Sequence, residues 1–384
     1  MELTKCKLGE LITQRREKND GSDLPICGVS KDGLIPPKQK DADTSIYNVF
    51  YRDDFIFNPA RMELNSIAIN DMYDRAICSS LYEVFYVHRT DLLLPHYLEL
   101  IIRQKWFTRY CEFLGQGSAR EYCRFGNISE IEIEFPPIEE QQKIVEYNTA
   151  IENRIALKQK INDNLVAVGT ASIQKNVGRG ALINLTEAEM DSLIFPEDFK
   201  IKTVSEFCAE TKSGSTPSRT NNEYWENGTI SWVKSGEVHN NITLQTEEYI
   251  TSLGLSESST KLLPKDTVLM AMYGVTAGEV GYLAIEATTN QAICGMICRS
   301  KAEAAYLYFS LIQSQAAISR LSNGGAQDNL SKNFIDNIKI VVPPSEFIEK
   351  LNLAAIVEQM TLNTKEITLL EELQGSVLAQ LSSR

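Results

Sequence analysis

Features that mark several common classes of protein are scarce in this sequence of 384 residues. It has three histidines, and none of its eight cysteines forms a Cys-x-x-Cys pair, which disfavours both a zinc site and a disulfide framework. No apolar run approaches the roughly 20 residues that a membrane-spanning helix needs. The N-terminal segment lacks the apolar core of a signal peptide, so we expect a cytoplasmic protein that does not enter a membrane.

The sequence also has no excess of positively charged residues. The net charge is −13, and no stretch of the chain is a basic block or tail. A free-standing DNA-binding protein usually carries a positive footprint. The charge therefore disfavours strong nucleic-acid binding by this chain alone, although net charge does not exclude a local basic patch.

The motifs of a self-contained enzyme are also missing. There is no Gly-x-x-x-x-Gly-Lys-Ser/Thr phosphate loop. Phe57–Ala60 has the Asn-Pro of an amino-methyltransferase motif but lacks its second proline and aromatic residue, and we interpret it as a strand end and turn. Adjacent acids such as Asp53 and Asp54 would point to opposite faces of a strand, which disfavours an acid–base pair. We predict no catalytic residue, no metal site and no cofactor bound by this chain.

What the sequence does contain is an internal repeat. A strand-like run, two prolines and a long amphipathic stretch occur twice, with Pro136-Pro137 in the first copy and Pro343-Pro344 in the second. Proline suits the first turn of a helix, where its missing N–H would be unpaired anyway. We therefore predict long helices over residues 138–177 and 345–384, each with one glycine near its end, Gly169 and Gly375.

Both helices carry apolar residues at alternating steps of three and four, which is the pattern of a coiled-coil seam. We expect the two seams to pack on each other as an antiparallel coiled coil; two ordinary surface helices over separate cores are the alternative. Arg154 and Lys158 interrupt the first seam, and Asn363 is a polar seam position that could fix register. The apolar seam positions are Ile144, Tyr147, Ile151, Ile161, Leu165, Val168, Leu353, Ile356, Met360, Ile367, Leu370 and Val377.

The segments before each helix, residues 1–137 and 178–344, mix short strand-like runs with turns. Asp54–Asn58 is echoed by residues 266–270, Ala76–Cys78 by Ala292–Cys294, and the polar loop 116–120 by 323–327. One helix is expected over Pro95–Phe113. The predicted fold class is α+β, with two similar mixed α/β domains separated by the two long helices in a pseudo-two-fold arrangement.

Several segments resemble the specificity (S) subunits of type I restriction–modification systems. Thr211–Val238 and Val268–Gly281 are similar to two blocks of that family's target-recognition domains. Phe57–Ile67 and Gly117–Ile131 look like another subtype of the same domain, and Pro136–Asn164 resembles the family's central helix. The second helix departs from the pattern, because Phe347-Ile348 replaces the usual Glu-Gln.

The resemblance implies a non-catalytic DNA-binding subunit of an adenine methyltransferase and restriction complex. Each target-recognition domain would read half of a bipartite duplex DNA site, while the helices set the spacing and dock methyltransferase subunits, usually two. A restriction subunit could join, and S-adenosylmethionine would bind the partner. The candidate DNA contacts, each with a solvated turn or surface charge as the alternative, are Lys31, Arg61, Ser118, Arg120, Arg124, Thr216, Ser218, Arg219, Asn221, Lys234, Ser235, Gly325 and Gln327.

Two interpretations compete. A coiled-coil scaffold or adaptor that does not read DNA fits the acidity slightly better, whereas the paired recognition-domain blocks favour the DNA-reading subunit. Trp225 and Trp232 are expected in the core rather than stacked on bases, because large aromatic side chains dominate cores.

Overall fold

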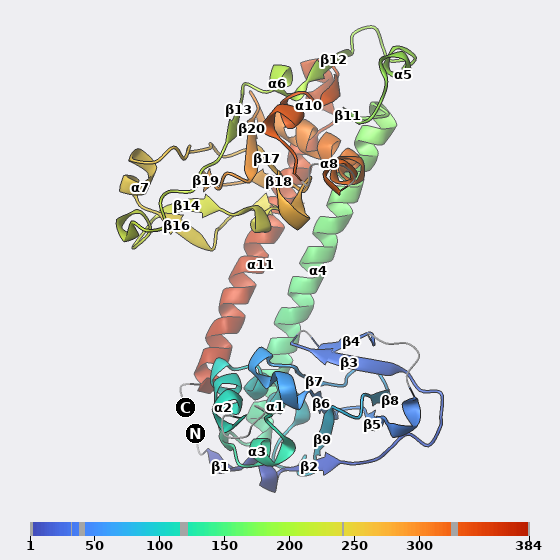
Figure 1. The fold of residues 1–384 in the computed structure, drawn as a ribbon, viewed down its shortest axis with the longest axis vertical. Coiled ribbons are helices and arrows are strands. Elements are labelled where there is room, and N and C mark those ends of the chain that lie inside the picture. Colours follow the sequence, from blue (N-terminus) through green and yellow to red (C-terminus); the bar gives the residue numbers. More distant parts are fainter. Residues whose placement is uncertain are drawn as a thin grey trace. The chain divides into compact units, whose positions relative to one another are not determined.

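The computed structural model (Figure 1) describes residues 3–31, 33–37, 43–115, 122–239, 242–323 and 329–382. The chain forms two compact units, Met1–Arg154 with Leu370–Arg384, and Ile155–Leu369. Both units mix helices and strands, which confirms the α+β class with two domains and two long helices. The pseudo-two-fold arrangement stays a prediction.

The first unit is built on two four-stranded sheets and one strand pair. Aromatic packing joins its core, where the Phe55 and Phe85 rings stack with centroids 4.9 Å apart. The sheet orders are β2(Ile12–Arg15)-β9(Glu83–Val87)-β6(Phe55–Phe57)-β7(Ile67–Ile69), then β4(Gly33–Ile35)-β3(Ile26–Ser30)-β8(Arg75–Cys78)-β5(Asn48–Tyr51), and β1(Thr4–Lys7)-β10(Glu132–Phe135).

Two helices, α1(Pro95–Ile102) and α2(Lys105–Gly115), replace the single helix predicted over Pro95–Phe113, so that prediction is wrong. The Gln104 side-chain amide donates to the Leu100 carbonyl oxygen at 3.1 Å, which is the acceptor that a continuing helix would use for a backbone N–H. The Gln104 N–H instead bonds to the Ile101 carbonyl, and the helix ends there.

The second unit has sheets of five, three and three strands, and helix α8(Lys301–Asn323) packs against the five-stranded sheet and one of the three-stranded sheets. Eight consecutive α8 residues, from Ala304 to Leu311, are fully buried. The sheet orders are β13(Glu210–Ser213)-β20(Ile293–Ile297)-β17(Thr267–Ala271)-β18(Val280–Leu283)-β15(Ile242–Thr243), then β16(Glu248–Ile250)-β14(Ile230–Val233)-β19(Thr288–Thr289), and β11(Ala181–Leu182)-β21(Lys339–Val342)-β12(Lys200–Thr203). Short helices are α5(Glu187–Asp191), α6(Val204–Phe207), α7(Ser252–Ser256) and α9(Lys332–Asp336), and α3(Phe125–Ser129) in the first unit.

Sheet topology repeats between the units. The order β2-β9-β6-β7 matches β13-β20-β17-β18, and in each unit a strand near the start pairs antiparallel with the strand before the prolines, β1 with β10 and β12 with β21. The second sheets correspond as well, because β3 lies parallel to β8 as β14 lies parallel to β19. The chain is therefore a duplicated unit.

One of the sequence matches that suggested the duplication is wrong. Ala76–Cys78 lies in β8, whose counterpart by pairing is β19, whereas Ala292–Cys294 opens β20, the counterpart of β9. Short apolar runs resemble one another by composition, and only strand pairing shows which runs correspond. The match of Asp54–Asn58 with residues 266–270 is consistent with the pairing, since β6 and β17 occupy the same place.

The first long helix, α4(Ile138–Asn176), begins directly after Pro137 as expected. Gln141 is fully buried and fastens its first turn, because its amide donates to the carbonyl oxygens of Leu92 at 2.7 Å and Pro136 at 2.8 Å. Its oxygen accepts the Leu94 N–H at 2.9 Å. One side chain thus joins the helix to the segment that precedes α1.

The second long helix is interrupted. A short helix, α10(Ser345–Lys350), precedes α11(Leu353–Ser382), and Asn352 between them adopts a left-handed backbone with φ 53°. The prediction of one helix over 345–384 is therefore wrong at its start. The Phe347 ring packs edge-on against Phe199 at 5.2 Å, which anchors α10 to its unit.

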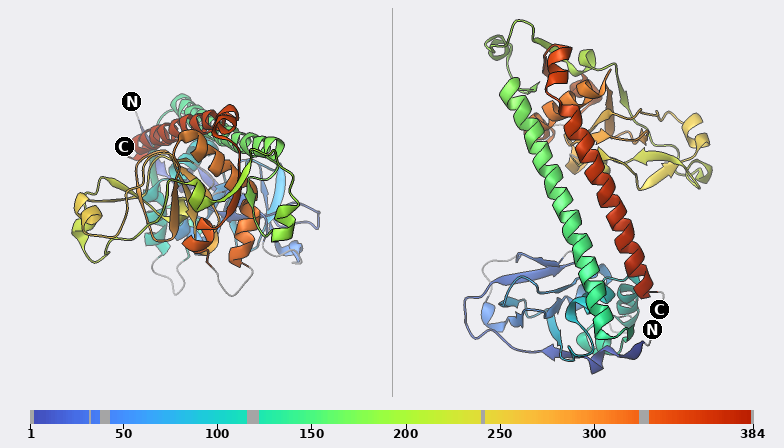
Figure 2. Two further views of the ribbon diagram at one scale, coloured as in Figure 1. Left: turned by 90° about the horizontal axis from the view of Figure 1, so that it is seen from above. Right: turned by 180° about the vertical axis from the view of Figure 1, so that it is seen from behind.

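In the second unit α4 and α11 contact each other and run antiparallel, as Figure 2 shows for their parts within Ile155–Leu369. The Asn363 amide donates to the Asn162 oxygen at 2.9 Å, and Lys158 reaches both Asn363 at 3.1 Å and Glu366 at 2.7 Å. In the first unit Gln374 donates to Asn148 at 3.0 Å. Polar pairs therefore join the helices in each unit, while regular coiled-coil packing along their length stays a prediction.

Most of the predicted seam positions are buried or half-buried, namely Ile144, Ile151, Ile161, Leu165, Leu353, Ile356, Met360, Ile367, Leu370 and Val377. Tyr147 and Val168 are wrong, because their side chains are 66% and 55% exposed. The inward positions are the adjacent Asn148 and Gly169. Asn148 and Gly169 are three heptads apart, so this seam position lies one residue later than predicted at both places, without drift out of the heptad repeat.

Candidate nucleic-acid interface

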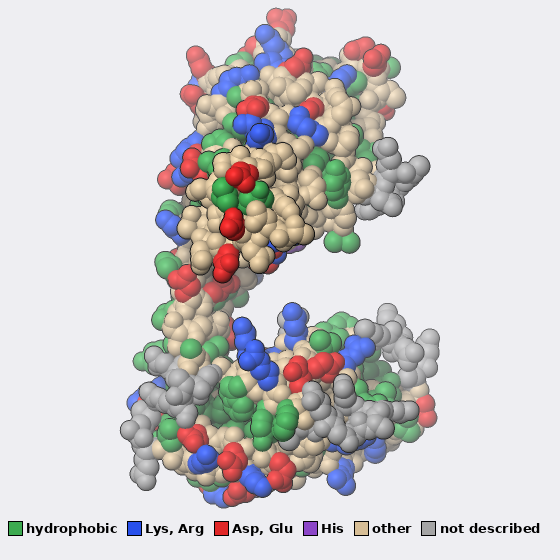
Figure 3. Space-filling view, turned by 60° about the vertical axis from the view of Figure 1, so that its left-hand side comes forward, with side chains coloured by type: hydrophobic (Ala, Val, Ile, Leu, Met, Phe, Trp, Pro, Cys, Tyr) green, Lys and Arg blue, Asp and Glu red, His purple; other side chains and the backbone are tan. Residues whose placement is uncertain are grey.

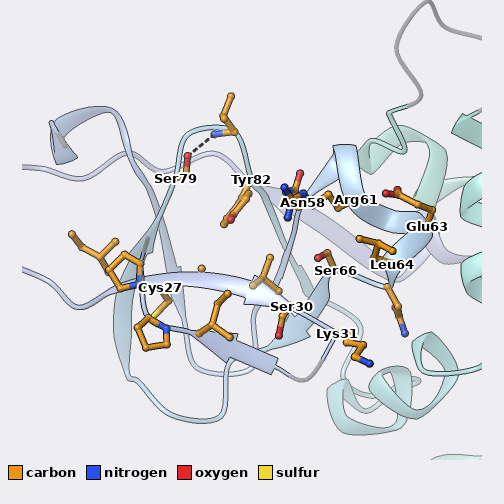
Figure 4. Close-up of a pocket in the computed structure, with 18 of the residues that line it drawn as sticks. Cys27, Ser30, Lys31, Asn58, Arg61, Glu63, Leu64, Ser66, Ser79 and Tyr82 are labelled. Carbon is orange, nitrogen blue, oxygen red and sulfur yellow. Dashed lines mark hydrogen bonds between the residues drawn. The ribbon is translucent and has the colours of Figure 1, made fainter. Parts of the chain in front are cut away.

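In the first unit the candidate residues Lys31 and Arg61 line one hollow of about 1130 Å³ (Figure 4). Lys31 follows β3, and Arg61 lies on the short helix η3(Pro59–Leu64) that connects β6 to β7. The Asn58 side chain caps η3 by accepting the Ala60 N–H at 3.1 Å, so the segment is the strand end and turn expected from the sequence.

Apolar and polar side chains both line the hollow, and its charged lining residues are more often positive than negative. Arg103 also lines it, and its guanidinium donates to the Lys31 carbonyl oxygen, while Glu63 is the acid among its lining residues. Arg61 has no ion-pair partner within the described ranges. Arg103 was missed by sequence reasoning because the expected helix ran straight through it.

The other first-unit candidates lie elsewhere. Arg124 does not line the hollow: it pairs with Glu83 at 3.2 Å and lies over the Tyr122 ring at 5.4 Å. Ser118 and Arg120 fall outside the described residues, as do Gly325 and Gln327 of the second unit.

In the second unit the candidate loop that follows β13 is fastened at several points. A side chain at Gly214 would overlap the Asn290 carbonyl oxygen, so glycine is required for this close approach. The indole N–H of Trp232 donates to the Ser215 carbonyl at 3.1 Å, and that of Trp225 donates to the Ser218 carbonyl at 3.0 Å. The Thr216 hydroxyl donates to Gln291 at 2.5 Å. The loop is thus held in one conformation by side chains from distant segments.

Arg219 ends this loop over the two tryptophans. Its guanidinium carbon lies 3.6 Å from the Trp225 ring centroid and 4.8 Å from that of Trp232, and the two rings meet edge to face at 5.0 Å. Trp232 is 3% exposed, which agrees with the expected core role, whereas Trp225 is only half-buried, so for Trp225 that role stays a prediction. Cation–π contacts of this kind favour a fixed guanidinium.

Both candidate cations of the second unit are paired with acids. Arg219 forms an ion pair with Glu248, and Lys234 contacts Glu247 at 2.5 Å and Glu248 at 3.3 Å. The hydrogen bond from Arg219 lowers the pKa of Glu248, so its carboxylate is ionised at neutral pH. Sequence reasoning considered Glu247 and Glu248 only as an unsuitable acid–base pair, and did not connect Glu248 with these cations because it lies in another strand.

The remaining candidates have local structural partners. The Ser218 hydroxyl bonds to that of Thr220 at 2.9 Å, and Asn221 caps the helix η4(Asn222–Tyr224) by accepting the Glu223 N–H at 3.1 Å. Ser235 begins the helix η5(Ser235–Glu237) directly after Lys234. The structure therefore brings Thr216, Ser218 and Arg219 onto one loop, with Lys234 joined to Arg219 through Glu248.

Charges of both signs are interspersed over each unit on the face shown in Figure 3. Within the described ranges, no group of histidine, cysteine, aspartate or glutamate side chains could hold a metal ion. None of the helices in the described part of the chain is long and apolar enough to span a membrane.

Comparison with known proteins identifies the family to which this chain belongs. The family model for the type I restriction modification DNA specificity domain matches residues 6–167 and 196–373. The HindI specificity subunit of Haemophilus influenzae is 22% identical over 76% of this chain and 77% of its own length. The EcoR124I/EcoR124II specificity subunit of Escherichia coli is 26% identical over 51% of this chain and 46% of its own length.

A solved structure shows the same fold. The crystal structure of the type I restriction–modification S subunit from M. genitalium matches with a TM-score of 0.58 and 16% identity, covering 99% of this chain and 96% of that one. Both copies of the repeat are included in the family match. The chain therefore belongs to the family of type I restriction–modification DNA specificity subunits.

Proposed function

We propose that each unit of this specificity subunit reads one half of a bipartite site in duplex DNA, while α4 and α11 set the distance between the halves. The repeated sheet order supports this assignment most directly, because a duplicated unit supplies two surfaces of the same kind. Side chains at base edges specify sequence, and contacts to phosphates set the register. Lys31 and Arg61 in one unit, and Thr216, Arg219 and Lys234 in the other, are the candidate contacts.

The long helices are the proposed docking surface for two methyltransferase subunits. Large apolar side chains are exposed along both helices, and where such side chains form a contiguous patch they mark a protein contact. On α4 they include Tyr147 and Leu157, and on α11 Leu362, Leu369 and Leu373, all at least 50% exposed. This role also explains why Tyr147, predicted for the seam, faces outward.

The chemistry would then belong to the partners. S-adenosylmethionine would bind the methyltransferase subunits, which would flip the target adenine out of the duplex, and a restriction subunit could join the complex. The chain itself would bind no cofactor and would act in the cytoplasm.

The test is to express the chain with its neighbouring methyltransferase in a host that lacks this modification and to map methylated adenines by sequencing. We expect one split motif with a spacer of constant length. Replacing residues 178–344 with the corresponding segment of another family member should change one half of the motif only. A single uninterrupted motif of a few base pairs would contradict the proposal.

A scaffold that does not read DNA is the competing function, favoured by the net charge of −13 and by the paired cations of the second unit. Under that function methylation would still need this chain, but the segment exchange would leave the target sequence unchanged.

A further inference from the structure

Glu248 lies at the centre of the second unit's candidate surface. It begins β16 and faces Trp232 of β14 in the strand register. Its carboxylate is the one that contacts both Arg219 and Lys234. The Glu248 side chain is 30% exposed, and those of Arg219 and Lys234 are 49% and 32% exposed, so solvent and a ligand can reach all three groups.

Arg219 does not depend on Glu248 alone for its position. The Trp225 face holds the guanidinium at 3.6 Å, and the indole N–H of Trp225 also holds the backbone one residue before it, at Ser218. If the Glu248 charge were removed, Arg219 would stay over the ring as an unpaired cation. The same change would leave Lys234 with Glu247 as its partner.

The charges of this cluster cancel. Two carboxylates, Glu247 and Glu248, face two cations, Arg219 and Lys234. Affinity for DNA of any sequence comes from cations that neutralise phosphates and release counterions. Cations already paired with carboxylates contribute little to that affinity until a phosphate replaces the carboxylate.

We propose that Glu248 is a specificity-determining positioning residue, which withholds Arg219 and Lys234 from phosphates of DNA that lacks the correct sequence. When the base contacts are correct, the DNA backbone comes close enough for its phosphate oxygens to replace the Glu248 carboxylate. DNA of the wrong sequence leaves the ion pairs of Glu248 with Arg219 and Lys234 intact. A group that acts against the wrong ligand can raise discrimination without tightening the right complex. The inference rests on the proposed function, because it assumes that this surface contacts DNA.

The test uses the full chain assembled with its methyltransferase subunits. Binding of Glu248→Gln and of the unaltered protein is measured on a duplex with the mapped site and on one with the second half-site scrambled, over a series of salt concentrations. One additional phosphate contact steepens the dependence of log K on log salt by about 0.9. At 0.1 M salt this corresponds to roughly eightfold tighter binding of the scrambled duplex, while binding of the correct duplex changes less and the discrimination ratio falls.

Glu247→Gln is the matched control. It removes one negative charge from the residue next to Glu248, which also contacts Lys234, but it leaves both ion pairs of Glu248 in place. It should change the salt dependence much less than Glu248→Gln. The double variant Arg219→Ala, Glu248→Gln should lose most of the increase in affinity for the scrambled duplex that Glu248→Gln alone produces. Unfolding midpoints of all variants show whether each remains folded.

An unchanged salt dependence and discrimination ratio for folded Glu248→Gln would overturn the inference. An equal rise in affinity for both duplexes would also overturn it, because Glu248 would then have only a general charge effect. A loss of affinity for the correct duplex alone would do the same, because Glu248 would then be a base contact. If the unaltered complex itself fails to discriminate the two duplexes, the proposed function fails instead.

Discussion

The two glycines of the long helices should respond to alanine with opposite signs. Gly169 of α4 is buried against Phe309 of α8, a fully buried ring, and a Cβ at Gly169 would come no more than 2.6 Å from three ring atoms. Gly375 of α11 is exposed, and an added Cβ there meets no atom within 4 Å. Both replacements remove the same conformational cost of a glycine inside a helix, so the two variants differ only in the atoms that surround the added methyl group.

The magnitudes follow from two opposing effects. Alanine in place of glycine inside a helix stabilises by about 1 kcal/mol. Overpacking a dense core costs about 1–3 kcal/mol, and the close approach to three ring atoms places Gly169→Ala near the upper end. We expect Gly375→Ala to stabilise the protein by about 1 kcal/mol and Gly169→Ala to destabilise it by about 1–2 kcal/mol.

Tryptophan fluorescence during thermal unfolding can report on each unit. Trp225 and Trp232 lie in the second unit with Gly169, whereas Trp106 and Gly375 line one groove of the first unit. A Trp106→Phe background therefore isolates the Gly169 effect, and a Trp225→Phe, Trp232→Phe background isolates that of Gly375. Each kcal/mol corresponds to a midpoint shift of about 2–4 °C for a unit of this size. If Gly169→Ala raises the midpoint as Gly375→Ala does, the packing argument is refuted.

Three further outcomes are expected. Asn363→Ala should destabilise the second unit by about 1–3 kcal/mol in urea unfolding, because Asn363 is buried and its loss leaves the Asn162 oxygen and the Lys158 ammonium without this partner; an unchanged midpoint would show that these bonds add nothing. Gln141→Glu keeps the shape but cannot donate to the two carbonyls that Gln141 binds, so the first unit should lose about 3 kcal/mol or more in the same assay. Bonds from the Thr203 backbone N–H and hydroxyl lower the pKa of Glu206 below its ordinary value, so its stabilising effect is present above the unfolded-state pKa and is lost as pH falls through the folded-state pKa. Acid unfolding of Glu206→Gln should therefore depend less on pH below about 4.5, and an unaltered profile would count against the capping role.

Much of the local structure could be predicted because its signals lie within a few residues of one another. The paired prolines predict where α4 and α10 begin, and both helices start there. The strand predicted at Asp54–Asn58 is β6, and its end is the turn expected from Asn58. The family resemblance, carried by contiguous segments, is confirmed over both copies of the repeat.

Predictions failed where the outcome depended on distant atoms. The helix expected over Pro95–Phe113 has two parts because one side chain, Gln104, takes a carbonyl from the backbone ladder. Tyr147 is exposed because the inward position is the next residue, whose partner Gln374 lies at the other end of the sequence. The break at Gln104 leaves no signal in the local pattern, whereas the charged Arg154 at a predicted seam position, followed by the half-buried Ile155, was a local sign of the shift.

The sequence by itself determined that this protein is a duplicated α+β chain with two long helices and the family's recognition blocks, because periodicity, proline placement and contiguous motifs are local properties of a chain. Only the tertiary structure decided which strands of the two copies correspond, and that Arg219 and Lys234 share the carboxylate of Glu248. Those contacts depend on pairing between distant segments: the register of β14 and β16 places Glu248 opposite Trp232, and the Trp225 and Trp232 rings hold Arg219 beside it.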